Sequence, residues 1–168
     1  MASCLVGSEM CIRDRSERYY CMSIDIQRIL LETQILPEYK TQLALQKAPG
    51  SKLSGEGTLS DLDDVTEDMF TEFIYDMKYT NSILKEHNVY RARLMKLKPR
   101  TNYTYHQDYT KRFHIPLITN DKCFFVIDDK VIRYPADGNY HIIDTTKLHT
   151  AINGSTEDRI HIIGCINE

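Results

Sequence analysis

The period of the hydrophobic pattern changes at about residue 88, and this change restricts the possible folds more than any other feature. From residue 89 to residue 166 apolar and polar residues alternate, which is typical of strands with one buried face. Turn-forming segments rich in Gly, Asp and Asn interrupt the alternation. The predicted strands are 89–97, 102–107, 112–118, 123–127, 130–134, 140–144, 148–153 and 159–166. So many short strands favour an antiparallel sandwich or barrel.

The residues before position 88, where the hydrophobic period changes, predict helices that pack outside this barrel. Apolar residues of 23–36 recur at helical spacing, and Pro37 ends that helix. Residues 41–46 alternate and predict a short strand, whereas 48–64 is rich in Gly, Ser and Asp and predicts a loop that could serve as a lid. A second helix is predicted from 66 to about 86. Its apolar stripe consists of Phe70, Phe73, Ile74, Met77 and Leu84.

The first residues of the chain have a separate origin. The run "CLVGSEMCIRDR" resembles the translation of a sequencing adapter, so residues 1–15 are interpreted as an artefact and excluded from fold prediction. The alternative is a genuine N-terminal segment, such as a weak signal peptide. We expect residues 16–168 to form one domain, in which 16–88 is a helical and loop part and 89–166 is the β core.

Charge and cysteine content favour some partners and settings over others. The net charge of −3 gives no reason to expect nucleic acid or a membrane surface as a partner. No apolar run approaches the ~20 residues that a membrane-spanning helix needs. Outside the adapter-like segment three cysteines remain, and none forms a CxxC pair. This usage argues against a disulfide framework or a zinc knuckle and predicts a reducing, cytoplasmic setting.

The stretch "NYTYHQDY" places His106 and Asp108 two residues apart on a predicted strand, so both would share one face. His149 follows about forty residues later on another predicted strand. Two imidazoles and one carboxylate can occupy one face of an octahedral metal and leave the other face open, as in non-haem Fe(II) oxygenases. The alternatives are a hydrogen-bonded His–Asp pair on a sheet surface and a core histidine at 149.

Arg159 strengthens the metal interpretation. It lies ten residues after His149, at the start of the last predicted strand. A 2-oxoglutarate co-substrate chelates iron through its keto-acid end, so its far carboxylate needs a fixed, planar cation, which Arg supplies better than Lys. The alternative is that Arg159 pairs with Asp158 or Glu157 at the turn.

Residues from about 89 to 166 resemble the double-stranded β-helix of 2-oxoglutarate/Fe(II)-dependent oxygenases. Within that group they most resemble the aspartyl/asparaginyl β-hydroxylase family. The matching words are "LKPRTNYTYHQD", "RFHIPLIT", "GNYHIIDTTKLHTAIN" and "DRIHIIGCIN". The resemblance implies an α+β, mainly β fold: a jelly-roll or cupin-like barrel with N-terminal helices packed outside.

The resemblance also implies cofactors and an activity. The implied iron ligands are His106, Asp108 and His149. Arg159 would hold the distal carboxylate of 2-oxoglutarate, and Arg112 and His114 of "RFHIPL" would contact the carboxylate nearer the metal. The implied reaction hydroxylates an unactivated C–H and releases succinate and CO2. An Asp or Asn side chain in a peptide is the substrate that the family suggests, while prolyl residues, free amino acids and small metabolites stay open.

The sequence also departs from the family pattern. Met95 stands where the animal enzymes often have a serine that helps to bind 2-oxoglutarate, and the aromatic "WHP" ending is absent. Asp108 is present, although the animal enzymes lack this iron-binding carboxylate. A halogenase needs that coordination position for chloride, so Asp108 favours hydroxylation. Arg112 could instead be a solvated edge charge, and the role of His114 is equally open.

Three rival functions are compatible with the sequence. One is a metal-dependent, cupin-like barrel that does not use 2-oxoglutarate, which Arg159 disfavours. Another is a non-catalytic barrel that binds metal or a small ligand and keeps a relic triad. The last is a structural or assembly protein that is indifferent to metal. Dependence on the co-substrate, iron binding and self-association distinguish these functions.

Overall fold

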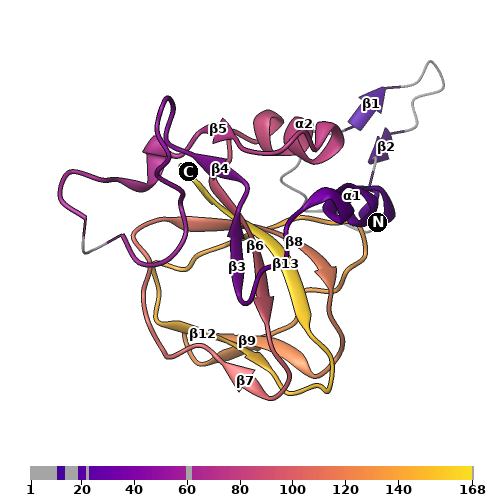
Figure 1. Ribbon diagram of the computed structural model, residues 1–168. Coiled ribbons are helices and arrows are strands. Elements are labelled where there is room, and N and C mark those ends of the chain that lie inside the picture. The colour runs from indigo at the N-terminus through magenta and orange to yellow at the C-terminus, as the bar shows by residue number, and fades with distance from the viewer. Residues whose placement is uncertain (1–10, 14–18, 22, 60–61, 168) are drawn as a thin grey trace.

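Two antiparallel sheets that face each other form the centre of the protein, whose computed structural model describes residues 11–13, 19–21, 23–59 and 62–167 (Figure 1). The larger sheet has the order β11 (His141–Ile143), β8 (Lys111–Ile118), β13 (Arg159–Ile166), β6 (Tyr90–Leu97) and β3 (Gln42–Ala44). The smaller sheet has the order β10 (Lys130–Ile132), β9 (Cys123–Ile127), β12 (His149–Asn153) and β7 (Thr101–Asn102). The predicted mainly β, jelly-roll architecture is confirmed.

Alternation along the strands gives the larger sheet two different faces. On β8, Phe113, Ile115 and Leu117 are buried in the apolar cluster that includes the helices. Their neighbours Arg112 and His114 point to the opposite face, because successive side chains of a strand alternate. The outer face is therefore a conventional apolar core, and the inner face of the same sheet is polar.

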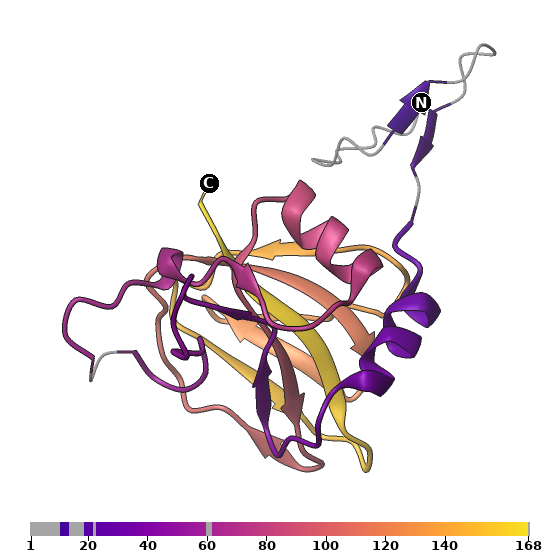
Figure 2. The same cartoon turned by 45° about the horizontal axis from the view of Figure 1, so that its top comes forward.

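The helices cover the outer face, as predicted (Figure 2). Helix α1 (Ile26–Glu32) continues into a 3₁₀ turn, η1 (Thr33–Ile35), and α2 is Lys78–Glu86. Asp25 caps α1 by accepting a hydrogen bond from the backbone N–H of Arg28 at 3.0 Å. The carboxylate of Glu32 accepts hydrogen bonds from the backbone N–H groups of Tyr79 (2.8 Å) and Thr80 (2.9 Å), so it binds the N-terminus of α2.

A second, smaller apolar cluster lies between the sheets. It consists of Leu97, Phe125, Ile127, Ile143 and Ala151. The ring of Phe125, on β9, also meets the inner face of the larger sheet: His114 lies at 5.4 Å between ring centroids, and the guanidinium of Arg159 lies 4.7 Å from the ring centroid. The two sheets therefore enclose an interior that is apolar at one part and cationic at another.

The predicted helix 66–86 is wrong over its first half. Residues Glu67–Met69 form a 3₁₀ turn (η2), Glu72–Phe73 form strand β5, and the helix begins only at Lys78. Strand β5 pairs with β4 (Gln46–Lys47), and the two strands form a separate two-stranded sheet. This pairing between distant segments prevents the helix that the spacing of apolar residues predicted.

The side chains of this segment show the same outcome. Phe70, Met77 and Leu84 are buried, but Ile74 is exposed. A single helical stripe would have buried all four residues, so the apolar spacing across 66–77 reflects burial at separate points of an irregular chain.

The strand predicted at 102–107 is also mostly wrong. Strand β7 ends at Asn102, and the chain then leaves the smaller sheet before returning at His106 as an isolated bridge to His149. The other strands of 89–166 lie within three residues of their predicted bounds at each end. The predicted strand 41–46 is interrupted at Leu45, and the described part of 48–64 forms no helix and no strand longer than a bridge.

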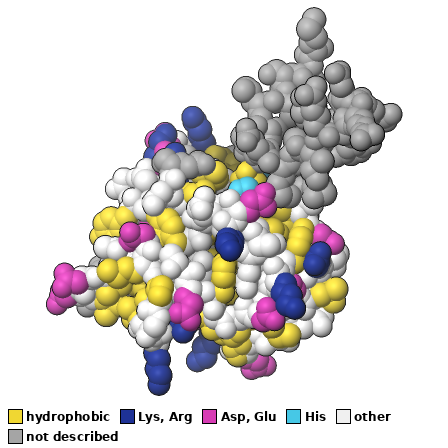
Figure 3. All heavy atoms as spheres, turned by 90° about the horizontal axis from the view of Figure 1, so that it is seen from above, with side chains coloured by type: hydrophobic (Ala, Val, Ile, Leu, Met, Phe, Trp, Pro, Cys, Tyr) yellow, Lys and Arg dark blue, Asp and Glu magenta, His cyan; other side chains and the backbone are white. Residues whose placement is uncertain are grey.

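The adapter-like segment falls mostly outside the described residues. Of residues 1–15 the structure describes 11–13, where β1 (Cys11–Arg13) pairs with β2 (Tyr19–Cys21). Among the described residues no helix has the length and hydropathy to cross a membrane. On the surface seen from above in Figure 3, basic and acidic side chains are interspersed, which fits the small net charge.

A core truncation tests the helix-covered face. Ile115 is fully buried in the outer cluster. We expect Ile115→Ala to lower the free energy of unfolding by about 2–5 kcal/mol, because it removes buried methyl groups and leaves a cavity. Urea unfolding measures the change. The matched control is Val131→Ala on β10, where the side chain is 56% exposed; an equal loss in both variants would contradict the assigned core.

Candidate metal and co-substrate site

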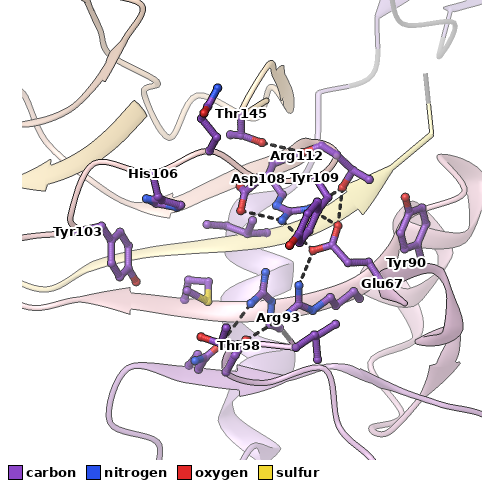
Figure 4. Close-up of a pocket in the computed structure, with 18 of the residues that line it drawn as sticks. Thr58, Glu67, Tyr90, Arg93, Tyr103, His106, Asp108, Tyr109, Arg112 and Thr145 are labelled. Carbon is purple, nitrogen blue, oxygen red and sulfur yellow. Dashed lines mark hydrogen bonds and ion pairs between the residues drawn. The ribbon is translucent and has the colours of Figure 1, made fainter. Parts of the chain in front are cut away.

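The three predicted metal ligands come together where strand β12 begins. Figure 4 shows two of them, His106 and Asp108. His149 is the first residue of β12, and His106 and Asp108 lie on the segment that follows β7. One ligand atom from each residue lies within 4.8 Å of the others. The Nε2 atom of His149 is 3.7 Å from Oδ2 of Asp108.

Backbone hydrogen bonds fix this convergence. The N–H of His106 donates to the carbonyl of His149 at 3.1 Å, and the N–H of His149 donates back to the carbonyl of His106 at 2.9 Å. The N–H of Asp108 donates to the carbonyl of Thr145 at 2.8 Å. The ligand set is therefore held by main-chain contacts that do not depend on a regular strand.

The orientation of both imidazoles suits a metal. The Nδ1 atom of His106 is 2.7 Å from the carbonyl oxygen of Thr104, and that of His149 is 2.9 Å from the carbonyl oxygen of Lys147. A carbonyl oxygen can only accept, so each Nδ1 carries the proton and each Nε2 keeps its lone pair. Backbone carbonyls orient metal-binding histidines in this way. Burial lowers the pKa of His149, which favours the neutral, metal-binding form.

The sheets enclose a cavity of about 900 Å³ behind these ligands, called the barrel cavity below. It is lined from both sheets and from residues 57–68. The predicted site residues all line it: His106, Asp108, His149, Arg112, His114 and Arg159. The structure therefore brings together the whole predicted set, although their roles stay predictions.

Arg159 is the most deeply buried cation of the cavity, with 2% of the residue exposed. Its Nη2 lies 3.0 Å from Nδ1 of His161, and its guanidinium stacks on Phe125. No ion pair involves Arg159 among the described residues, and Asp158 lies 3.9 Å from Lys96 instead. Burial lowers the pKa of Arg159 to about 10, so the side chain is still charged at neutral pH. The alternative in which Arg159 forms an ion pair with Asp158 at the turn is therefore excluded for this structure.

A buried ring nitrogen of His114 also lacks a hydrogen-bond partner among the described residues. Its Nδ1 makes no hydrogen bond in the part of the chain that the structure describes, and the same holds for Nε2 of His161. Burial, with the nearby charge of Arg159, keeps the pKa of His114 well below its usual value. Buried polar atoms are normally satisfied, so an unsatisfied pair beside a cavity indicates a place for a polar ligand.

Arg112 makes internal contacts in addition to lining the cavity. Its Nη1 and Nη2 both bind the carboxylate of Glu67, at 2.9 and 2.8 Å, and Nη2 also lies 2.9 Å from Oδ1 of Asp108. Nη1 further contacts the sulfur of Cys165 at 2.7 Å. Arg112 is buried, so it is not a solvated edge charge. The guanidinium of Arg112 already donates to the internal carboxylate of Glu67. The contact between Arg112 and the co-substrate, which the family resemblance implies, stays a prediction.

Glu67 is a site residue that sequence reasoning missed. Its carboxylate also pairs with Arg91 and accepts a hydrogen bond from the Thr110 hydroxyl at 2.8 Å. Burial alone would raise the pKa of Glu67, but the hydrogen bonds and charge of Arg112, with Thr110 and Arg91, lower it to about 2. Through Arg112 this carboxylate positions Asp108. The sequence offered no signal, because Glu67 was assigned to a helical first turn.

Arg93 was missed as well, although the alternation of "YRARLMKL" carries a signal for it. Arg93, Met95 and Leu97 share one face of β6, and the first two line the barrel cavity. A single arginine at an inward position of a buried strand is costly unless something binds it.

A charge-neutral substitution tests the contribution of Glu67. Because its pKa is about 2 in the folded protein and about 4.5 normally, the stabilisation is complete above pH ~4.5 and disappears as the pH falls towards 2. We expect Glu67→Gln to lose about 3 kcal/mol of unfolding free energy at pH 7 and less at pH 3.5. Urea unfolding at both pH values measures the gap. Glu38→Gln, at an exposed position, is the control, and a gap independent of pH would refute the assignment.

Comparison with known proteins places the chain in a family. The family model for aspartyl/asparaginyl beta-hydroxylase matches residues 57–166. A search of curated protein sequences found no match. Similar solved structures include a Photorhabdus luminescens protein (18% identity, TM-score 0.39, 46% of this chain), of whose length this chain covers 62%.

Two further similar structures are a cupin domain from Bordetella pertussis and a predicted oxalate decarboxylase from Thermotoga maritima. The first has 14% identity and a TM-score of 0.41, with 48% of this chain and 82% of that chain covered. The second has 17% identity and a TM-score of 0.40, with 52% and 73% covered. The family match extends over more than half of the sequence and includes every predicted site residue. The protein belongs to the aspartyl/asparaginyl beta-hydroxylase family.

Proposed function

We propose that the protein is an Fe(II)- and 2-oxoglutarate-dependent hydroxylase of an unactivated C–H. The observation that carries the proposal is the meeting, in one cavity, of a His–Asp–His donor set with a buried arginine that has no anionic partner among the described residues. A metal alone would account for the donor set. A dicarboxylate co-substrate accounts for the arginine as well.

The donor set fits Fe(II). One ring nitrogen of each histidine and a carboxylate oxygen lie within 4.8 Å of one another, and all three residues line the barrel cavity. Two imidazoles with one carboxylate suit iron that keeps open positions for a co-substrate and dioxygen. Residues His106, Asp108 and His149 would hold the metal.

The interior fits 2-oxoglutarate. Arg159 offers a fixed guanidinium for its distal carboxylate, and the unsatisfied Nδ1 of His114 lies on the same inner face. Removing water from an unpaired guanidinium is costly, and an entering carboxylate would offset that cost. The co-substrate would therefore place a negative charge next to the most buried cation of the interior.

The chain contributes the positioning of the metal and the co-substrate. When bound, Fe(II) and 2-oxoglutarate together with dioxygen supply the chemistry that converts C–H to C–OH with release of succinate and CO2. Glu67 holds Arg112, and Arg112 holds one oxygen of Asp108, so the second oxygen is left for the metal. His149 is buried, Asp108 is half-buried and His106 is exposed, so the donor set lies where the cavity meets solvent. A carboxylate at position 108 favours hydroxylation over halogenation.

The substrate and setting remain predictions. An Asp or Asn side chain in a peptide is the substrate that the family suggests, and a small molecule is the alternative. The cytoplasmic setting also stays a prediction. A cupin-like metal enzyme without 2-oxoglutarate, or a non-catalytic metal-binding barrel, would leave Arg159 without a role.

Anaerobic spectroscopy tests the cofactor pair. Purified protein mixed with Fe(II) and 2-oxoglutarate without oxygen should show a visible metal-to-ligand charge-transfer band. Asp108→Ala should weaken the band by loss of metal. Arg159→Ala should weaken the affinity for 2-oxoglutarate by about 10- to 100-fold, because it removes a charge-assisted bidentate contact.

Arg133→Ala is the matched control, since Arg133 is exposed. Its band and affinity should equal those of the wild type. Absence of the band in the wild type, with iron demonstrably unbound, would overturn the proposed function and favour a non-catalytic barrel. A band that survives both Asp108→Ala and Arg159→Ala would show that the cofactors bind elsewhere.

A further inference from the structure

Arg93 is a buried cation that the proposed cofactors leave unexplained. Only 8% of the residue is exposed, and it projects from β6 into the barrel cavity (Figure 4). Its Nε has no hydrogen-bond partner, and its Nη1 makes a long contact of 3.4 Å with Oε1 of Gln42. No ion pair involves Arg93 in the described part of the chain.

The nearest carboxylate is already shared. Glu67 binds Arg91 and both terminal nitrogens of Arg112, so it serves two guanidiniums before Arg93 is considered. Burial, together with the charge of Arg91, lowers the pKa of Arg93 to about 10, and the side chain is still charged at neutral pH. A buried charge with an unsatisfied donor indicates a missing partner.

The co-substrate site is at a different place along the same sheet. In the pairing of β13 with β6, Arg159 lies opposite Leu97, whereas Arg93 lies opposite Ile163. The two arginines are thus separated by four residues along the strands, or roughly 13 Å at ~3.3 Å per residue. A carboxylate bound at Arg159 therefore does not partner Arg93.

The surroundings of the two arginines differ in the same way. The cations nearest to Arg93 are Arg91 and Arg112, while Arg159 lies among His114 and His161. Tyr103 lies within reach of the charges of both Arg93 and Arg159, so the two guanidiniums share one cavity, and each needs its own anion.

The charge balance of the buried interior leads to the same conclusion. Arg91, Arg93, Arg112 and Arg159 are buried, and the partly buried acids Glu67 and Asp108 face them. The other acidic residue of the lining, Asp68, is exposed. Two positive charges are therefore in excess. Bound Fe(II) would add two positive charges and the 2-oxoglutarate dianion would remove two, with its distal carboxylate at Arg159. The charge of Arg93 is left for a second anion.

We propose that Arg93 binds a carboxylate of the substrate, so that this enzyme selects carboxylate-bearing compounds over the corresponding amides. This inference rests on the proposed function for its assignment of the ligand as substrate. A carboxylate is the anion that fits, because Arg91 and Arg112 are already paired with Glu67, which leaves the single planar guanidinium of Arg93 to match two carboxylate oxygens. Arg93 is thereby a specificity-determining residue, and Gln42 supports its guanidinium.

Binding of matched acids and amides tests the proposal. The probes are a capped aspartyl peptide with its asparaginyl counterpart, and L-proline with L-prolinamide. Calorimetric titration is performed on the metal-free protein and on the anaerobic protein saturated with Fe(II) and 2-oxoglutarate. In at least one pair the acid should bind the wild type at least tenfold more tightly than the amide. Arg93→Met should abolish that preference.

Three further variants make the result specific. Arg93→Lys keeps the charge and should retain part of the preference, which also covers the case that Arg93→Met misfolds. Arg159→Met should lose affinity for 2-oxoglutarate, whereas Arg93→Met should not. Arg100→Met, at an exposed arginine, should behave as the wild type.

The outcomes separate this inference from the proposed function. If neither pair shows an acid preference in the wild type, or if the preference survives Arg93→Met, the inference is overturned even when the charge-transfer band is present. Loss of 2-oxoglutarate affinity in Arg93→Met would also overturn it, because Arg93 would then be a co-substrate residue. An Arg93-dependent acid preference without any charge-transfer band would support the anion site and reject the oxygenase function.

Discussion

The larger sheet has to bury both of its faces, and the rest of the structure depends on how differently those faces are made. Apolar residues of β8 and β13 meet α1 and α2 on one side. On the other side, the same strands present arginines and histidines to the smaller sheet. A closed apolar interior would have been more stable, so the polar inner face is a cost that a bound ligand offsets. The helices make this possible, because they supply the apolar core that the barrel interior does not.

Within that interior, one carboxylate pairs with two of the four buried arginines among the described residues. Glu67 neutralises Arg91 and Arg112, and Arg112 in turn fixes Asp108 beside the two histidines. Arg93 and Arg159, which Glu67 does not reach, are the cations available to ligands. In the proposed function this division would keep a co-substrate and a substrate apart. Each anion would be bound by its own arginine, four residues apart along the paired strands β6 and β13.

Much of the fold could be predicted from the sequence because alternation over 89–166 is a local pattern with a direct structural meaning. The helix expected at 66–86 failed in its first half because pairing of β5 with β4 and the burial of Phe70 are decided by distant residues. Spacing of apolar residues cannot reveal such contacts. The strand at 102–107 failed for a similar reason, since the regular pairing with β12 ends at Asn102 and His106 adds only an isolated bridge.

The candidate site was predictable where residue types are chemically distinctive. Few residue types can bind a metal ion, and arginine is the residue type best suited to a carboxylate. The sequence therefore allowed four site residues to be chosen, and the structure places them in one cavity: His106, Asp108, His149 and Arg159. The partner of Arg112 could not be predicted, because Glu67 is distant in sequence and lies in a misassigned segment. Arg93 was overlooked since an arginine on a strand is usually solvated.

A crystal structure obtained without oxygen, with Mn(II) in place of iron and with 2-oxoglutarate, tests the central claim most directly. The account predicts a metal bound by His106, Asp108 and His149, with the distal carboxylate of 2-oxoglutarate on Arg159 and no co-substrate contact at Arg93. A metal outside this triad, or a co-substrate carboxylate seated on Arg93, would contradict it.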